Sequence, residues 1–142
     1  QAEVNRLVSN NLLTNEQAGL IDCEKLLPFF QSDFCRKLID SGDKILREFK
    51  FSVLEDASVF DPSLVGEQIL MQGVVDCAIV EDDGITVIDF KTDKVSEDTV
   101  EQLTEQYRTQ VAVYADALCR IYQKPVKAAF LYFFRLGKVI RT

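Results

Sequence analysis

Residues 73–93, GVVDCAIVEDDGITVIDFKTD, contain two apolar runs separated by an acidic turn. Residues 67–80 and 85–92 are rich in Val and Ile, which favour strands, and Glu81-Asp82-Asp83-Gly84 between them has the composition of a tight turn. Two such runs joined by a short turn predict a β-hairpin. We therefore expect the fold to be organised around a pair of antiparallel strands.

Three ionisable side chains of this hairpin are predicted to lie together. Asp89 and Lys91 are two residues apart and project from the same face of their strand, because side chains alternate between faces. A turn closed by Asp82-Asp83, or by all four residues 81–84, places Asp76 directly opposite Asp89. A slip of two residues places Asp76 opposite Lys91 instead. Both registers bring the same three groups together.

Two carboxylates on apolar strands repel each other unless a cation neutralises them. Oxygen ligands, in a sequence without His, favour Mg²⁺ or Mn²⁺ over zinc. The remaining positions on such a metal suit water and a phosphate, so we predict phosphodiester hydrolysis, with Lys91 positioning the water or stabilising negative charge. The alternative is a structural ion pair between Asp76 and Lys91, with Asp89 merely at a strand end.

A long helix is predicted after the hairpin. Ser96-Glu97-Asp98-Thr99 supplies an N-cap and an acidic first turn, and Lys124-Pro125 ends the helix after about Tyr122. Gln110 and Tyr114 share one face of it with Tyr107. Aromatic residues on such a face usually pack in the core, whereas a buried amide needs hydrogen-bond partners. Gln110 and Tyr114 are therefore candidate site residues, and purely structural roles stay open for both.

The rest of the chain predicts helices followed by strands. Residues 1–44 read as helical hairpins, with helix starts at Thr14 and at Ser32-Asp33 and a stop at Ser41-Gly42. Residues 44–54 and 126–134 read as strands. Glu48 is a further acidic candidate, although exposed strand carboxylates are common. We predict an α/β (α+β) fold, a mixed and partly antiparallel sheet with helices, in a single domain over residues 1–142.

Composition limits the class of protein. The 47% hydrophobic content indicates a globular core, and no apolar run approaches the roughly 20 residues that cross a bilayer. No secretion signal is apparent at the N-terminus, so we expect a cytoplasmic protein. The four cysteines are widely spaced and read as free thiols rather than zinc ligands. With a net charge of −7, the domain is expected to bind DNA weakly on its own.

Three segments taken together resemble the PD-(D/E)XK nuclease superfamily. They are Gly73-Val74-Val75-Asp76, the run Ile85 to Asp93 (ITVIDFKTD), and the run Gln110 to Leu118 (QVAVYADAL). The chain is most similar to the RecB-like branch, and within it to the C-terminal nuclease domains of AddA-type ATP-dependent helicase/nuclease subunits. The similarity covers nearly the whole sequence.

The resemblance implies a restriction-endonuclease-like core with Asp76, Asp89 and Lys91 as catalytic residues. It implies that Asp76, Asp89 and the Phe90 carbonyl bind Mg²⁺, that Gln110 and Tyr114 match the helix motif, and that Glu48 matches an additional acidic residue. It further implies an exonuclease acting on single strands from duplex DNA ends in recombinational repair, with a helicase in the same polypeptide and an AddB-like partner subunit.

Family members carry a Gly-x-x-x-His helix ahead of the segment that begins here, so we expect a truncated fragment whose isolated catalysis is impaired.

The sequence leaves two other functions as alternatives. A stand-alone exonuclease of the Cas4 group would need a cysteine quartet, which lone Cys119 does not supply. A catalytically inactive docking or DNA-end-binding module would keep Asp76, Asp89 and Lys91 only by accident.

Overall fold

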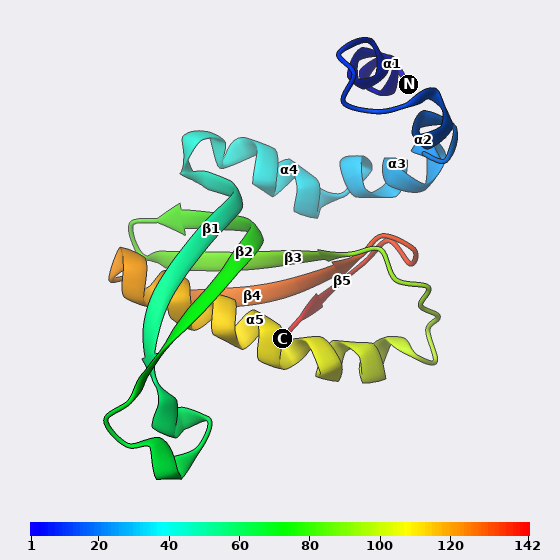
Figure 1. The fold of residues 1–142 in the computed structure, drawn as a ribbon. Helices are drawn as coiled ribbons and strands as arrows, with labels where there is room; N and C mark the ends of the chain where they lie inside the picture. The colour runs from blue at the N-terminus through cyan, green and yellow to red at the C-terminus, as the bar shows by residue number, and fades with distance from the viewer.

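The computed structural model describes residues 1–142 as helices followed by a mixed five-stranded sheet. The strands lie in the order β1-β2-β3-β4-β5, with β3 and β4 parallel and the other neighbours antiparallel. Figure 1 shows the arrangement. The elements are α1 (Ala2–Ser9), α2 (Asn15–Gly19), α3 (Cys23–Gln31), α4 (Asp33–Asp40), η1 (Gly42–Lys44), β1 (Ile45–Asp56), η2 (Ala57–Val59), η3 (Pro62–Leu64), β2 (Gln68–Glu81), β3 (Gly84–Lys91), α5 (Val100–Tyr122), β4 (Val126–Phe133) and β5 (Lys138–Arg141).

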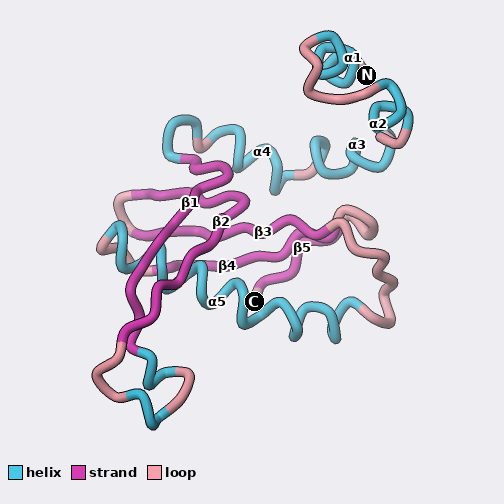
Figure 2. The backbone as a smooth tube through the Cα atoms, in the orientation of Figure 1, coloured by secondary structure: helices cyan, strands magenta, loops and turns pink.

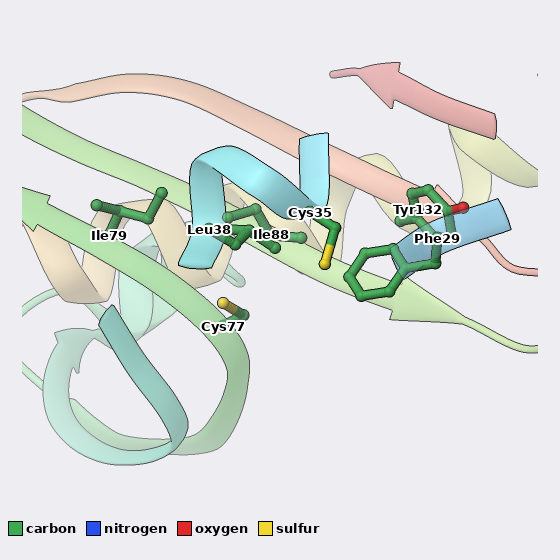
Figure 3. Close-up of a cluster of buried hydrophobic side chains, with 7 residues drawn as sticks. All are labelled: Phe29, Cys35, Leu38, Cys77, Ile79, Ile88 and Tyr132. Carbon is green, nitrogen blue, oxygen red and sulfur yellow. The ribbon is translucent and has the colours of Figure 1, made fainter. Parts of the chain in front are cut away.

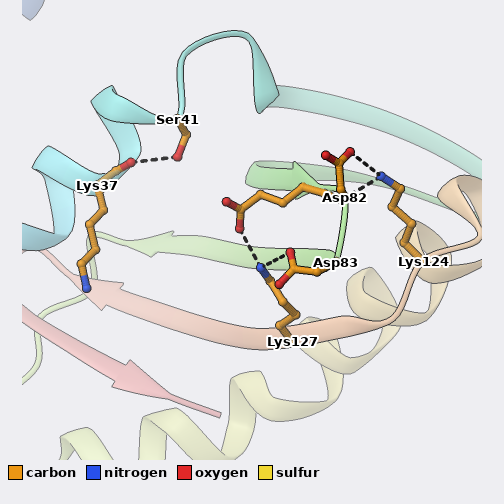
Figure 4. A network of polar contacts seen from close by, with 7 residues as sticks. Lys37, Ser41, Asp82, Asp83, Lys124 and Lys127 are labelled. Atoms are coloured by element: carbon orange, nitrogen blue, oxygen red, sulfur yellow. Dashed lines mark hydrogen bonds and ion pairs between the residues drawn. The ribbon is translucent and has the colours of Figure 1, made fainter.

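The predicted hairpin forms with the predicted register. Glu81 pairs with Gly84 and Cys77 with Ile88, so Asp82-Asp83 is a two-residue turn. Lys127 on β4 holds this turn by ion pairs to Glu81 and Asp83, both at 2.7 Å (Figure 4). These partly exposed contacts are individually weak, but they join the hairpin turn to the strand that returns beside it.

Helix α5 connects β3 to β4, which explains why these two strands are parallel. It covers one face of the sheet, where Ala117 and Leu118 pack on Ile85 and Val87. The predicted strand 126–134 corresponds to β4. The sequence reading missed β5, which follows a turn at Gly137 (φ 60°) and pairs with β4 through four residues.

Helices α3 and α4 cover the opposite face of the sheet. Phe29, Cys35 and Leu38 from these helices pack on residues of β2, β3 and β4 (Figure 3). Phe29 lies edge-on to Tyr132, with ring centroids 4.8 Å apart. The central strands of the sheet are therefore covered by α5 on one side and by α3 and α4 on the other.

The helix starts at Thr14 and Ser32 are confirmed. Thr14 forms a capping box with Gln17, and the Ser32 hydroxyl accepts a hydrogen bond from Cys35 N. The expected hairpin is absent between α3 and α4, because Ser32 alone separates them and they follow one another along the sheet (Figure 2). A single connecting residue is too short a loop for an antiparallel pair of helices.

Helix α5 begins later than predicted from the acidic residues 96–99. Its first residue is Val100, and the N-cap Thr99 makes no capping hydrogen bond to the helix. The Thr99 hydroxyl instead accepts from Ser96 N at 3.0 Å, so residues 96–99 form a turn of their own.

No helix has the length and apolar character of a membrane span. All four cysteines are free, and Cys35 and Cys77 are buried.

Candidate functional site

The candidate site lies where β2 separates from β3. Their pairing ends at Cys77 and Ile88, one step before Asp76 and Asp89 would face each other. Continuation of the ladder would give Phe90 N a backbone acceptor on Val75. The Asp76 carboxylate replaces it, since Asp76 Oδ2 accepts from Phe90 N at 2.9 Å. Asp76 is thereby fixed beside residues 89–91, as the sequence predicted.

Asp89 and Lys91 form a buried ion pair. Lys91 Nζ lies 2.6 Å from Asp89 Oδ2, and only 2% of Asp89 and 9% of Lys91 is exposed. The predicted neighbours are therefore together. The purely structural alternative required an ion pair between Lys91 and Asp76, but Lys91 pairs with Asp89. Despite the short contact, Asp89 Oδ2 accepts no properly aligned hydrogen bond. The contact with Lys91 is therefore ionic, and the buried carboxylate depends on that one ammonium to balance its charge.

Burial raises the pKa of the Asp89 carboxyl above its usual value. The Lys91 ammonium opposes this effect, while the carboxylates of Asp76 and Asp93 add to it. The site thus holds more negative charge than one ammonium satisfies. A divalent cation next to the carboxylates would favour the ionised form of Asp89.

Gln110 and Tyr114 join this site through one chain of hydrogen bonds. Lys91 Nζ donates to Gln110 Oε1 at 2.8 Å, and Gln110 Nε2 donates to the Tyr114 hydroxyl at 2.7 Å. Burial raises the pKa of the Tyr114 hydroxyl. The amide of Gln110 has both its oxygen and its nitrogen engaged within the protein, so its first task here is to orient Lys91.

Gly73 of β2 lies next to the Tyr114 ring. A Cβ on Gly73 would stand 2.7 Å from the Phe51 ring and 3.4 Å from the Tyr114 ring. Phe51 is buried and meets Tyr114 edge-on at 5.9 Å between centroids. Gly73, which opens the first segment of the resemblance, therefore leaves room for the two rings that support Gln110.

Glu48 lies opposite Asp76 in the register of β1 and β2, at a position where the pairing is interrupted. Its φ of 49° is unusual for a residue with a side chain and marks a local distortion of β1. Glu48 and Asp76 border the same pocket of about 320 Å³, which Phe29, Phe30 and Phe90 also line. Glu48 is thus near Asp76, but it is exposed and forms no hydrogen bond or ion pair with Asp89 or Lys91.

Tyr107, which contacts Lys91, and Asp93, which contacts Tyr107, had no role predicted from the sequence. The Lys91 ammonium lies 3.6 Å from the centroid of the Tyr107 ring, and the Tyr107 hydroxyl donates to Asp93 Oδ1 at 3.0 Å. Tyr107 was read only as part of the core face of the helix. Its spacing of three residues from Gln110 was the one available signal.

The residues present fit a hard divalent cation bound through oxygen. Asp76 and Asp89 supply two carboxylates, one of them with an oxygen that lacks a hydrogen bond, and Phe90 beside them supplies a backbone carbonyl. No group of three or more His, Cys, Asp or Glu side chains is gathered anywhere in the chain. A cation here would therefore rely on the backbone, water or phosphate for its other ligands. The four thiols form no cluster that could hold iron and sulfur.

Comparison with known proteins agrees with this geometry. Residues 4–141 match the family model of the PD-(D/E)XK nuclease superfamily. The chain is 40% identical over 152 aligned positions to an ATP-dependent helicase/nuclease subunit of Bacillus cereus (strain AH820), and 39% identical over 150 positions to its counterpart in Bacillus mycoides (strain KBAB4). These alignments cover 100% and 99% of this chain but only 12% of each relative.

Proposed function

This chain belongs to the PD-(D/E)XK nuclease superfamily, and on that premise we propose that it is a deoxyribonuclease that uses Mg²⁺ or Mn²⁺ to hydrolyse phosphodiester bonds. The observation that carries the proposal is the buried Asp89 carboxylate, which lies close to Asp76 while a single ammonium, that of Lys91 at 2.6 Å, is paired with it. A structural ion pair needs one carboxylate for one ammonium, whereas this site holds two carboxylates. A metal ion would neutralise the charge that Lys91 leaves unbalanced.

The proposed ligands are Asp76, Asp89 and the carbonyl of Phe90. A bound Mg²⁺ would polarise the scissile phosphate and lower the pKa of a bound water. Asp76 is held in place by Phe90 N, so it needs little rearrangement to serve as a ligand. We assign no metal contact to Glu48, whose place beside the pocket suits contact with substrate or water.

Lys91 is the proposed stabiliser of the negative charge that develops on the phosphate. Its ammonium sits beside the carboxylates and is oriented by Gln110, whose own amide is fixed by Tyr114. Gln110 and Tyr114 then act as positioning residues.

We further propose that the domain works as an exonuclease within a larger helicase–nuclease. The chain spans 12% of the length of relatives whose name combines both activities, and its net charge of −7 is unsuited to gripping DNA alone. The helicase part of the same polypeptide and a second helicase–nuclease subunit would deliver a single strand from a duplex end. Processing of double-strand ends for recombinational repair follows as the proposed role.

The test combines metal binding with cleavage. Calorimetry with Mg²⁺ and Mn²⁺ is performed on the chain, on Asp76→Ala, and on Asp98→Ala, which removes an exposed carboxylate outside the site. Cleavage of linear single-stranded DNA is assayed in parallel. Binding and cleavage that survive Asp98→Ala but vanish in Asp76→Ala support the proposal. Cleavage that persists in Asp76→Ala, or a folded chain that binds neither metal, contradicts it.

A further inference from the structure

The Lys91 ammonium is enclosed by three groups. Asp89 Oδ2 lies 2.6 Å away, Gln110 Oε1 accepts a hydrogen bond at 2.8 Å, and the Tyr107 ring lies with its centroid at 3.6 Å. An ammonium has three N–H donors, and the face of an aromatic ring attracts a cation. The ammonium is therefore held by one ion pair, one hydrogen bond and one contact with an aromatic face.

The ring itself is held at both ends. Its Cα belongs to α5, one turn before Gln110, and its hydroxyl donates to Asp93 Oδ1 at 3.0 Å. Asp93 follows Lys91 by two residues, beyond the end of β3. Burial, followed by the hydrogen bond to Asp93, raises the pKa of the Tyr107 hydroxyl, which therefore stays a donor. Asp93 thus fixes the orientation in which the ring faces Lys91.

The ring has a task that arises only when a cation is bound. A divalent ion on Asp89 repels the Lys91 ammonium and competes for the same oxygen. A lysine side chain is flexible and strongly hydrated, so an ammonium that loses its carboxylate swings toward water unless other contacts keep it. Gln110 Oε1 and the Tyr107 ring are the two contacts that a cation on Asp89 does not take away.

We infer that Tyr107, oriented by Asp93, is a positioning residue that keeps the Lys91 ammonium beside the carboxylates once a divalent cation occupies them. This inference rests on the proposed function. It separates Tyr107, whose ring faces the Lys91 ammonium, from another aromatic residue of α5, Tyr122, which packs on Phe49 at 5.9 Å between centroids.

A spectroscopic test reads the position of Lys91 without requiring catalysis. In the full chain with isotope-labelled lysine, the Lys91 signal is identified by its loss in Lys91→Met. The Tyr107 ring should shift the Lys91 methylene protons upfield, and the shift should persist at saturating Mg²⁺. In Tyr107→Leu the upfield shift disappears. Return of the wild-type signal to an ordinary lysine position when Mg²⁺ is added overturns the inference.

Kinetics and calorimetry distinguish positioning from packing. Tyr107→Leu should lower kcat on single-stranded DNA about tenfold, in the range expected for a partly desolvated cation–π contact, with KM little changed. Tyr107→Phe keeps the ring and should recover most of the rate. Mg²⁺ affinity of Tyr107→Leu should be equal or higher, because an ammonium free to leave repels the ion less.

The matched control is Tyr122→Leu, which removes an aromatic ring from the same helix away from Lys91. A parallel fall of kcat and Mg²⁺ affinity in Tyr107→Leu, or an equal loss in Tyr122→Leu, shows that the ring only packs. In a Lys91→Met background Tyr107→Leu should have no further effect, and a further loss contradicts the inference. Failure of the wild type to bind Mg²⁺ overturns the proposed function and the inference with it, and leaves only the metal-free ring shift.

Discussion

Replacing Lys91 by Met tests whether the buried carboxylate of Asp89 depends on a neighbouring charge. Lys91→Met keeps most of the length of the side chain but leaves Asp89, 2% exposed, without the ammonium at 2.6 Å. Asp89 can then avoid an unpaired buried charge by taking up a proton. At pH 7 that costs about 1.4 kcal/mol for each pH unit above an ordinary carboxyl pKa of about 4, which gives a ceiling of about 4 kcal/mol.

The predicted loss of unfolding free energy in Lys91→Met depends on pH in a defined direction. The folded pKa of Asp89 in the variant lies above its unfolded value, so the penalty is absent below the unfolded pKa and grows as pH rises toward the folded one. Urea unfolding of the wild type and Lys91→Met without metal should therefore differ by less than about 4 kcal/mol at pH 7, because burial already raises the pKa of Asp89 in the wild type, and the difference should shrink as pH is lowered.

Two controls complete this measurement. The double variant Asp89→Asn, Lys91→Met has no buried charge and should lose the pH dependence. Saturating Mg²⁺ should narrow the gap between the wild type and Lys91→Met, because a cation replaces the ammonium. A stability difference that is the same at pH 5 and pH 7 would refute the reasoning, since it would mean that Asp89 is not the group left unpaired.

Three further outcomes follow from the structure. Gly73→Ala should lower the free energy of unfolding by about 1–3 kcal/mol, because its Cβ would stand 2.7 Å from the buried Phe51 ring. Gly19→Ala, whose Cβ would have no atom within 4 Å, is the control and should not destabilise the protein. Equal effects of the two substitutions in urea unfolding contradict this prediction. Burial raises the pKa of the Cys77 thiol to about 11, so at pH 8 a thiol reagent followed by mass spectrometry should modify Cys119 and spare Cys77; labelling at equal rates opposes it. The pKa of Asp89 is raised, so protons compete with metal for its carboxylate. Mg²⁺ affinity measured by calorimetry should therefore fall as pH is lowered, and the fall should begin at a higher pH than for an ordinary aspartate. An affinity independent of pH argues against Asp89 as a ligand.

The parts of the fold that the sequence predicted are those set by local rules. The two-residue turn fixed the register of β2 and β3, and the alternation of side chains then placed Asp89 and Lys91 on one face. Strand β5 was missed because its four residues, Lys138–Arg141, are ordered by pairing with β4 rather than by any pattern of their own. The start of α5 was misplaced because the Thr99 hydroxyl bonds back to Ser96.

The site was predicted as a set of residues but not as a set of contacts. Asp76, Asp89 and Lys91 follow from the hairpin, yet the choice of Asp89 as the partner of Lys91 depends on side-chain conformations that the register leaves open. The contact of Tyr107 with Lys91 depends on how α5 packs across β3, which no local pattern of the helix contains. Sequence periodicity gives the face of a helix, while tertiary packing selects which residue of that face meets the site.

Asp76 connects the stability of the sheet to the proposed chemistry. Its carboxylate takes the Phe90 N–H that a backbone carbonyl would receive if the β2–β3 ladder continued. The ladder therefore stops one step before the two aspartates, and the strands part where a cation would need carboxylates, a carbonyl and room for phosphate. Restoring the backbone pairing would remove that space. A substitution that cannot accept from Phe90 N should thus change the local sheet as well as the affinity for metal, whereas Asp76→Asn can keep the hydrogen bond and lose only the charge.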